Sequence, residues 1–415
     1  MSRVQVFSET GRLEDVILHP PGPEVENMTP ANAERALYSD ILNLSVATKE
    51  YNQLECSLQH IANTHRVSDL LSDILRSYEV KEKIVKKTCY NERRPDLVDF
   101  LLDQEPSELS RLLIEGVPQQ KTTLTNFLSN ENFALRPLHN FFFTRDSSIA
   151  LCDKVLIGKM ASKVRERESL IMEAIFNYHP RLRTQTIVAD DADIFGNPIT
   201  IEGGDILVAS ENILLAGIGA RTNTQGIDFL MQHFLQEKKP HHIIVQQLPQ
   251  SPESFIHLDM VFTLLDNDSC MVYEPLILHP NKYETVHIEL DNGKVKSIRT
   301  VENIPSVLAS LGMDLKPSYC GGDRDSMMQE REQWHSGANF FAVGPGKVIG
   351  YNRNVHTLEN LDKNGYSILK AKDLLNGKIN LDTYQRYVLT IDGSELSRGG
   401  GGARCMTMPL RRSVG

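Results

Sequence analysis

The six cysteines of this 415-residue sequence form no Cys-x-x-Cys pair, which argues against a disulfide framework and against a zinc knuckle. No apolar run approaches the roughly 18 residues of a membrane-spanning helix, and the first residues contain no apolar stretch like that of a signal peptide. Basic clusters are absent too, and 44 Lys and Arg against 54 Asp and Glu give a net charge of −10. These absences argue against nucleic acid or an anionic membrane as a partner, and we expect a protein of the reducing cytoplasm.

Motifs for phosphate and nucleotide binding are missing as well. No Gly-Lys pair is followed by Ser or Thr, and no Gly-x-Gly-x-x-Gly lies between a strand and a helix. We therefore expect no nucleotide cofactor, and the spacing of the cysteines predicts no metal site.

Glycine is absent from residues 23–115, whereas 23 of the 26 glycines lie from residue 117 onward. Residues 31–94 contain no proline either, and Pro95 and Pro106 fit the first turns of helices. Apolar residues recur at the spacing of an amphipathic helix at Val67, Leu70, Leu71, Ile74, Leu75 and Tyr78. The sequence predicts a helical bundle over residues 50–128, inserted into a catalytic domain formed by residues 1–49 and 129–415.

After residue 130 the pattern changes to a strand, a short polar turn, a second strand, a helix and a third strand. The clearest copy covers residues 199–245, with its helix over residues 225–236. Asp146, Asp205 and Asp259 open comparable units that are 59 and 54 residues apart, so we infer an internal repeat of about 55 residues. Repeated ββαβ units around an axis predict a closed α/β propeller; the alternative is a single mixed sheet with helices on both faces.

A glycine run precedes the last cysteine, where Gly399–Gly402 is followed by Ala403, Arg404 and Cys405. A loop of this kind lets the backbone approach a ligand closely. A cysteine directly after it is a candidate nucleophile. The alternative is a buried cysteine that acts only as a small hydrophobic residue.

Residues 255–262 alternate between polar and apolar side chains. Period two predicts a strand that carries His257 and Asp259 on one face. That face would hold a base and an acid together, although a histidine satisfied by a neighbouring aspartate is the ordinary structural interpretation.

Two further motifs contribute carboxylates. Glycines inside Glu202-Gly203-Gly204-Asp205 indicate a bulge or a close approach within a strand. Three phenylalanines precede Asp146 at the start of a repeat, where core packing would explain them equally well. Together with the thiol and the imidazole, these carboxylates could line one cavity suited to a planar cation, because guanidinium presents five N–H donors that carboxylates accept in pairs.

The ordered motifs resemble the arginine deiminase family of the guanidino-group-modifying superfamily over essentially the whole chain. They are SETGRLEDVILHPPG, ENMTP, PLHNFFFTRD, EGGD, HLDMVFT, REQWHSGAN and ELSRGGGGARCMTMPL. The resemblance implies a five-bladed ββαβ propeller, the pentein fold, with the helical bundle as an insertion. One departure is Gly400, where many members carry arginine in an SRGRGG context; this difference leaves open how the loop controls the thiol.

The resemblance also implies the chemistry of the site. Cys405, as a thiolate, would attack the guanidinium carbon of free L-arginine, and His257 would protonate the departing ammonia and then activate water. Glu202 would orient His257, and Asp146 and Asp259 would bind the guanidinium. Citrulline and ammonia would be the products.

By motif position, four other residues would support or bind the substrate. Asp205 would support the site, and Asn140, Arg165 and Arg221 would hold the α-carboxylate at the end opposite to the guanidinium. We expect a homo-oligomer that binds L-arginine, with neither nucleic acid nor a membrane as partner. The alternatives are an amidinotransferase of the same superfamily and a non-catalytic arginine-binding protein on the same fold.

Overall fold

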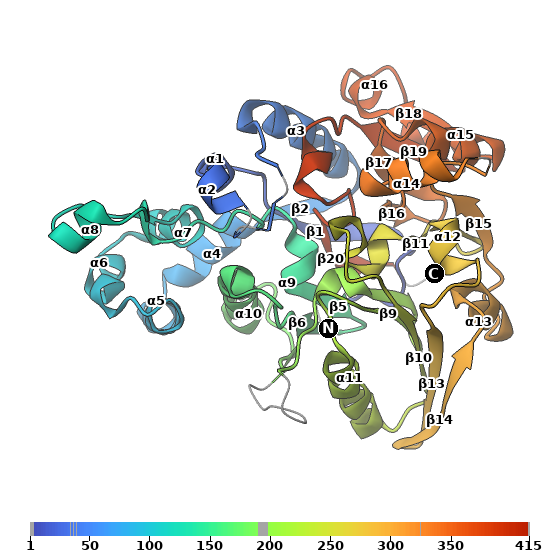
Figure 1. Cartoon of the computed structure of the whole chain (residues 1–415), viewed down its shortest axis with the longest axis horizontal. Helices are drawn as coiled ribbons and strands as arrows, with labels where there is room; N and C mark the ends of the chain where they lie inside the picture. Colours follow the sequence, from blue (N-terminus) through green and yellow to red (C-terminus); the bar gives the residue numbers. More distant parts are fainter. Residues whose placement is uncertain are drawn as a thin grey trace.

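The computed structural model describes residues 4–413, apart from residues 34, 36, 39, 190–197 and 324. Figure 1 shows small sheets gathered at the centre of the larger part of the molecule, with helices around their outside, and a group of helices projecting to one side.

Five sheets share one pattern, in which an antiparallel pair of strands is followed by a strand parallel to the second. Their strands, in that order, are β20 (Met408–Arg412), β1 (Leu13–Leu18) and β2 (Asn63–Arg66); β5 (Ser148–Leu151), β6 (Lys154–Ile157) and β7 (Thr186–Ile187); β8 (Ile206–Ser210), β9 (Ile213–Ile218) and β10 (His241–Gln247); β11 (Phe262–Leu264), β12 (Ser269–Val272) and β15 (Lys316–Tyr319); and β16 (Phe341–Gly344), β17 (Lys347–Tyr351) and β19 (Tyr387–Ile391).

Helices connect the second and third strands of these units. They include α3 (Leu44–Ile61), α10 (Glu166–Tyr178), α11 (Thr224–Glu237), α13 (Ile304–Ser310) and α15 (Val355–Lys363). The predicted ββαβ units are therefore confirmed, and the single mixed sheet is wrong, because the strands form separate sheets. Among the described residues no sheet closes on itself, so the strand pairing establishes a mixed α/β fold and no more.

The remaining elements extend the sheets or join them. The further strands are β13 (Thr285–Asp291) and β14 (Lys294–Val301), which widen the sheet of β8–β10, β18 (Ser367–Lys370), which pairs with β19, and the pair β3 (Val117–Pro118) and β4 (Phe133–Leu135). The further helices are α1 (Pro23–Glu26), α2 (Pro30–Ala33), α9 (Thr144–Ser147), α12 (Glu274–Ile277), α14 (Ser326–Trp334) and α16 (Ala371–Leu375), with 3-10 turns that include η3 (Gly203–Asp205), η5 (Leu258–Met260) and η7 (Leu396–Gly399).

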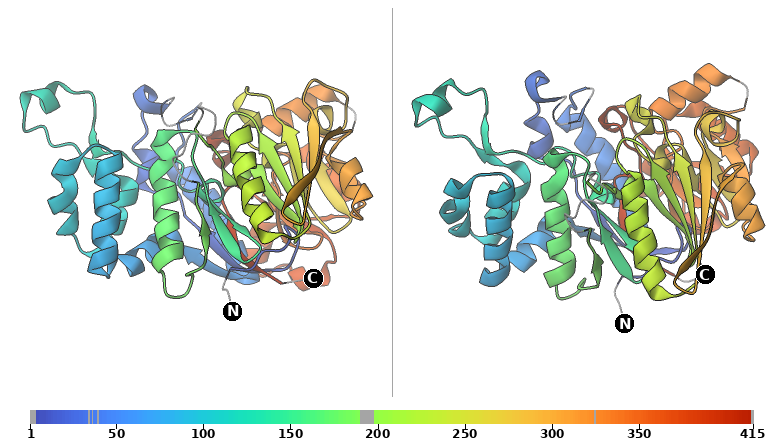
Figure 2. Two further views of the ribbon diagram at one scale, coloured as in Figure 1. Left: turned by 90° about the horizontal axis from the view of Figure 1, so that it is seen from below. Right: turned by 60° about the horizontal axis from the view of Figure 1, so that its bottom comes forward.

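The helical insertion projects from the sheets, as both views of Figure 2 show. It contains α4 (Val67–Leu75), α5 (Tyr78–Asn91), α6 (Val98–Leu102), α7 (Pro106–Glu115) and α8 (Leu124–Leu128). Pro95 opens a 3-10 turn and Pro106 opens α7, as predicted. The predicted start at residue 50 is not matched, because it falls within α3 and because β2, which follows, pairs with β1. We therefore begin the helical insertion at α4, and the division into two domains stays a prediction.

The helical insertion and the neighbouring sheets share one hydrophobic core. Leu71 of α4 and Leu113 of α7 belong to the same cluster as Phe176 of α10 and Met408 of β20, and all four side chains are fully buried. The insertion is thus packed onto the sheets through apolar side chains. Within the described ranges, no helix is both long enough and apolar enough to cross a bilayer.

The predicted strand over residues 255–262 is wrong for all but its last residue. Residues 258–260 form the 3-10 turn η5, and β11 begins only at Phe262. The reason is a tertiary contact, since the backbone N–H of Leu258 donates to Asp205 Oδ1 at 2.9 Å instead of to a neighbouring strand. The Glu202-Gly203-Gly204-Asp205 motif is likewise a turn, η3, directly before β8.

Candidate active site

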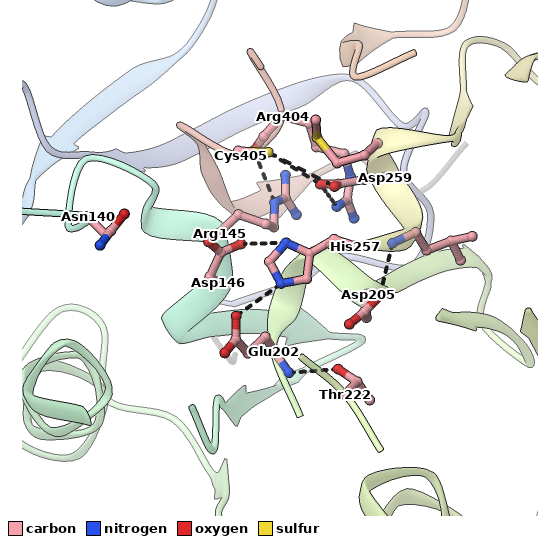
Figure 3. A network of polar contacts seen from close by, with 12 residues as sticks. Asn140, Arg145, Asp146, Glu202, Asp205, Thr222, His257, Asp259, Arg404 and Cys405 are labelled. Atoms are coloured by element: carbon pink, nitrogen blue, oxygen red, sulfur yellow. Dashed lines mark hydrogen bonds and ion pairs between the residues drawn. The ribbon is translucent and has the colours of Figure 1, made fainter. Parts of the chain in front are cut away.

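The candidate site residues lie at equivalent points of the five sheets, just before the first strand of each antiparallel pair. Asp146 lies in α9 before β5, Asp205 in η3 before β8, Asp259 in η5 before β11, Asn339 before β16 and Cys405 before β20. All five side chains are buried. Figure 3 shows how these turns bring most of the ionisable groups onto one centre.

His257 lies between two carboxylates. Its Nε2 is 3.0 Å from Glu202 Oε2, and its Nδ1 is 3.6 Å from Asp146 Oδ1 (Figure 3). Burial alone would lower the pKa of His257, but Asp146, the hydrogen bond to Glu202, and Asp205 outweigh it and raise the pKa to about 9. The imidazole is therefore a cation at neutral pH.

Gly204 allows this close packing. A Cβ atom at that position would lie 2.5 Å from Nδ1 of His257, so only glycine leaves room for the ring. At Gly203 a Cβ atom would likewise overlap with the carbonyl oxygen of Arg145, so the predicted close approach is confirmed at both glycines of the motif.

Glu202 is held as an ionised carboxylate. Its Oε1 accepts the backbone N–H of Ala161 at 3.0 Å, while Oε2 faces His257. Burial would raise the pKa of Glu202, yet the hydrogen bond and charge of His257, with Arg221 and Arg165, lower it well below its usual range. This carboxylate can therefore fix the orientation of the imidazole.

Cys405 faces Asp259 and the amide of Asn339. Its Sγ is 3.8 Å from Asp259 Oδ2 and 3.2 Å from Asn339 Nδ2. Burial, followed by the charges of Asp259 and Asp146, raises the pKa of the thiol well above its ordinary value. A thiolate at this position consequently needs a neighbouring positive charge.

Arg404 forms an ion pair with Asp259. Its Nη1 donates to Asp259 Oδ2 at 2.8 Å, and its Nη2 and Nε bind the buried carboxylate of Glu9. Burial raises the pKa of Asp259 above the usual range of an aspartate, although Arg404 and His257 oppose this.

Asp205 supports the turn that carries His257. Its Oδ1 accepts from the backbone N–H of Leu258, and its charge acts on His257. Burial raises the pKa of Asp205 to about 7, against the opposing effects of His257 and of a hydrogen bond from Thr222.

The three residues predicted to hold a carboxylate lie around Asp146 and Glu202. Arg165 Nη1 lies 2.7 Å from Asp146 Oδ2, and its other donors bind both oxygens of Glu168. Arg165 is therefore paired with carboxylates of the protein itself. The backbone carbonyl of Asn140 accepts from Arg165 Nη2 at 3.4 Å, whereas Arg221 is half-buried and acts on Glu202 through its charge. Their roles toward a carboxylate stay predictions.

Three residues of this centre could also act as ligands of a metal ion. Among the described residues, Asp146, Glu202 and His257 each offer a ligand atom, and these atoms lie within 4.8 Å of one another. Arg165 already supplies positive charge there, at 2.7 Å from Asp146 and 3.9 Å from Glu202. Its positive charge opposes the binding of a metal ion at these three residues.

Sequence reasoning missed several polar residues of this centre. Asn339 contacts Cys405, Glu168 binds Arg165, and Arg404 and Glu9 form ion pairs beside Asp259. Asn339 could have been found, because it opens the fourth ββαβ unit just as the aspartates open the first three. Arg404 lies 395 positions from Glu9 and 145 from Asp259, so these two ion pairs leave no local pattern, whereas Glu168 follows Arg165 by only three residues.

Comparisons with known proteins agree on the kind of molecule. The arginine deiminase family profile matches residues 34–412. A curated relative named arginine deiminase, from Limosilactobacillus fermentum (strain NBRC 3956 / LMG 18251), is 30% identical over 437 residues and covers 99% of each chain. Among solved structures, SxtG, an amidinotransferase from Microseira wollei, matches with a TM-score of 0.55 and 14% identity, covering 100% of this chain and 98% of that one. Unliganded AgrE matches with a TM-score of 0.54 and 15% identity over 97% of this chain, which spans only 40% of AgrE.

These structural likenesses establish the fold alone, a mixed α/β fold built of ββαβ units. The match to the family profile and to the curated relative is more specific. The chain belongs to the arginine deiminase family.

Proposed function

We propose that this protein hydrolyses the guanidinium group of L-arginine to give citrulline and ammonia, through a covalent intermediate on Cys405. The main support is that four groups lie together in one buried centre. They are the Cys405 thiol, the His257 imidazolium and the carboxylates of Asp146 and Asp259. Family membership supports the same reaction.

Carboxylates surround the place that a guanidinium would take. Asp146 Oδ1 is buried and accepts no hydrogen bond from the described residues, although it lies 3.6 Å from His257. A buried carboxylate oxygen without a donor is costly, and a guanidinium N–H would satisfy it. Asp259, beside Cys405, supplies the second carboxylate.

The substrate would also provide the positive charge that the thiol lacks. A guanidinium between Asp146 and Asp259 neutralises the two carboxylates that raise the pKa of Cys405. The thiol releases its proton to solvent as the guanidinium binds, and the thiolate attacks the guanidinium carbon. The resulting tetrahedral centre loses ammonia, which takes its proton from the imidazolium of His257. The product of this half-reaction is a cysteine-bound amidine that keeps the rest of the arginine.

Water completes the reaction. His257, now neutral and still bound to Glu202, accepts a proton from a water molecule. The oxygen of that water attacks the amidine carbon at the same time. Collapse of this second tetrahedral centre breaks the C–S bond, releases citrulline and returns the thiolate. The sum is arginine plus water to citrulline plus ammonia.

The five sheets with equivalent site turns also lead us to propose that they are the five blades of a propeller. In this arrangement the turns before β5, β8, β11, β16 and β20 would face one axial cavity. The burial of their polar residues supports it.

The function is tested with the purified full chain and L-arginine, in assays for citrulline and for ammonia. We expect equal amounts of both products, without an added amine acceptor and with EDTA present. Cys405→Ser should form neither product, whereas the matched control Cys270→Ser, at a buried cysteine of β12, should remain active. Ornithine formed only when an amine acceptor is added would favour the amidinotransferase, and arginine binding without any product would favour a non-catalytic protein.

A further inference from the structure

Asn339 is a buried amide that contacts the candidate nucleophile directly. It lies in the turn before β16, at the position that Asp146, Asp205 and Asp259 occupy in other sheets, and its side chain is 1% exposed. Its Nδ2 is 3.2 Å from Cys405 Sγ and 3.1 Å from the carbonyl oxygen of Asp259.

The neighbouring backbone fixes which way this amide points. Oδ1 of Asn339 accepts from the backbone N–H of Arg404 at 2.9 Å and from that of Cys405 at 3.4 Å. A flipped amide would turn its N–H donors toward these two N–H groups and its oxygen toward the carbonyl of Asp259. The NH₂ group must therefore face the sulfur.

The glycine loop leaves the space that Asn339 needs. A Cβ atom at Gly402 would lie 2.6 Å from Asn339 Oδ1 and 2.7 Å from Asn339 Cβ. Loop and amide are consequently packed as one unit around Cys405, and the amide joins this loop to the turn that carries Asp259.

Three charged groups act with Asn339 on the sulfur, and a buried phenol, Tyr351, lies in the same environment. Asp259 and Asp146 disfavour the thiolate and Arg404 favours it, while burial and the charge of Cys405 raise the pKa of Tyr351, whose hydroxyl donates to the carbonyl of Gly401. An N–H donor aimed at the sulfur stabilises the anion relative to the neutral thiol. Asn339 therefore opposes the effect of the two carboxylates, which raise the pKa of the Cys405 thiol.

We propose that Asn339 is a positioning residue that directs the Cys405 sulfur and favours its thiolate form by donating a hydrogen bond to it. The inference rests on the proposed function only in taking Cys405 as the nucleophile. It predicts a property of the thiol that can be measured without any turnover.

The test compares Asn339→Asp with the wild type. Aspartate keeps the size and an acceptor oxygen for the N–H groups of Arg404 and Cys405 but removes the donor. The rate at which iodoacetamide alkylates Cys405 is followed against pH by peptide mass spectrometry, which separates this residue from the other five cysteines. We expect the alkylation midpoint to rise by at least about one pH unit, and kcat for citrulline formation to fall about tenfold or more with a KM change below about threefold.

Two further variants make the result specific. Asn339→Ala removes the donor without adding a charge and should shift the midpoint in the same direction. Asn303→Asp changes a buried N-cap asparagine of α13 and should leave the profile unchanged. A wild-type alkylation profile in either folded Asn339 variant, with folding checked by thermal melting, overturns the proposal. If the wild type forms no citrulline and the midpoint still shifts, the proposed function fails while the role of Asn339 stands.

Discussion

At the scale of single residues, the protonation of His257 decides what the site can do. Three carboxylates act on one buried imidazole, namely Glu202, Asp146 and Asp205. They keep it protonated at neutral pH, which is the state required to give a proton to departing ammonia. Glu202 makes the shortest of these contacts, so it is the residue through which the protonation can be changed most directly.

The rate of citrulline formation should therefore fall as the pH rises through about 9, where His257 loses its proton. Glu202→Gln removes one carboxylate, lowers the pKa of His257 and should move this basic limb of kcat/KM to lower pH by about one unit or more. The exposed control Glu211→Gln should leave the limb in place. An unchanged basic limb in Glu202→Gln would show that another group titrates there.

The same protonation contributes to stability. Because folding raises the pKa of His257 from 6.5 to about 9, its contribution is fully present below pH 6.5 and is lost as the pH rises through 9. Unfolding by urea at several pH values should show the free energy of unfolding decreasing across this window, and Glu202→Gln should flatten the decrease. A slope that is the same in both proteins contradicts the assignment.

At the scale of elements, the turns before the strands are what build the site, and the glycine loop before β20 is the tightest of them. Gly401 packs against Phe143 and Gly402 against Asn339, whereas a Cβ at Gly400 would meet nothing within 4 Å. Gly400 adopts a φ of +83°, a conformation that disfavours other residues. An arginine at this position would meet no steric clash, but the positive φ would strain its backbone.

Gly402→Ala should disrupt the contact between the loop and Asn339. Overpacking of this kind costs about 1–3 kcal/mol, and we expect kcat/KM to fall at least about tenfold as Cys405 is displaced. Gly344→Ala is the matched control, because the added Cβ would lie 3.7 Å from the nearest atom and should have little effect. Steady-state kinetics and thermal melting of both variants check this, and a fully active Gly402→Ala would refute the packing argument.

Local patterns in the sequence predict the elements better than they predict the contacts between them. The helix expected over residues 225–236 is α11, Thr224–Glu237, because a 3.6-residue period is a local property. The alternation in residues 255–262 predicts a strand where the structure has η5, because Asp205 replaces a neighbouring strand as the partner of Leu258. That replacement joins residues 53 positions apart and is invisible in the local pattern.

The candidate site shows the same limit. The repeat positions of Asp146, Asp205 and Asp259 identify turns that meet at one centre, while Asn339 at the fourth position escapes notice because it carries no charge. Arg165 was expected at the far end of the site, but it pairs with Asp146 and Glu168. Glu168 lies three residues after Arg165, whereas the pairing with Asp146, 19 residues away, depends on three-dimensional packing.

At the scale of the whole molecule, the helical insertion and the sheets should unfold together, because they share one core. Leu113→Ala in α7 removes a fully buried side chain of that core and should lower the free energy of unfolding by about 2–5 kcal/mol in a single transition. Leu124→Ala in α8 changes a side chain that is 74% exposed and should have an effect within about 0.5 kcal/mol. Urea denaturation followed by circular dichroism and by activity tests this; a separate early transition of the insertion in Leu113→Ala would contradict a shared core.

The central claim is that Cys405 becomes covalently bound to the amidine carbon of arginine after ammonia has left. Intact-protein and peptide mass spectrometry of a reaction quenched in acid during turnover tests it most directly. The account predicts an adduct on Cys405 equal to the mass of arginine less that of ammonia, present in the wild type and absent in Cys405→Ser. An adduct of the amidino group alone would indicate amidino transfer, and citrulline formation by Cys405→Ser without any adduct would contradict the account.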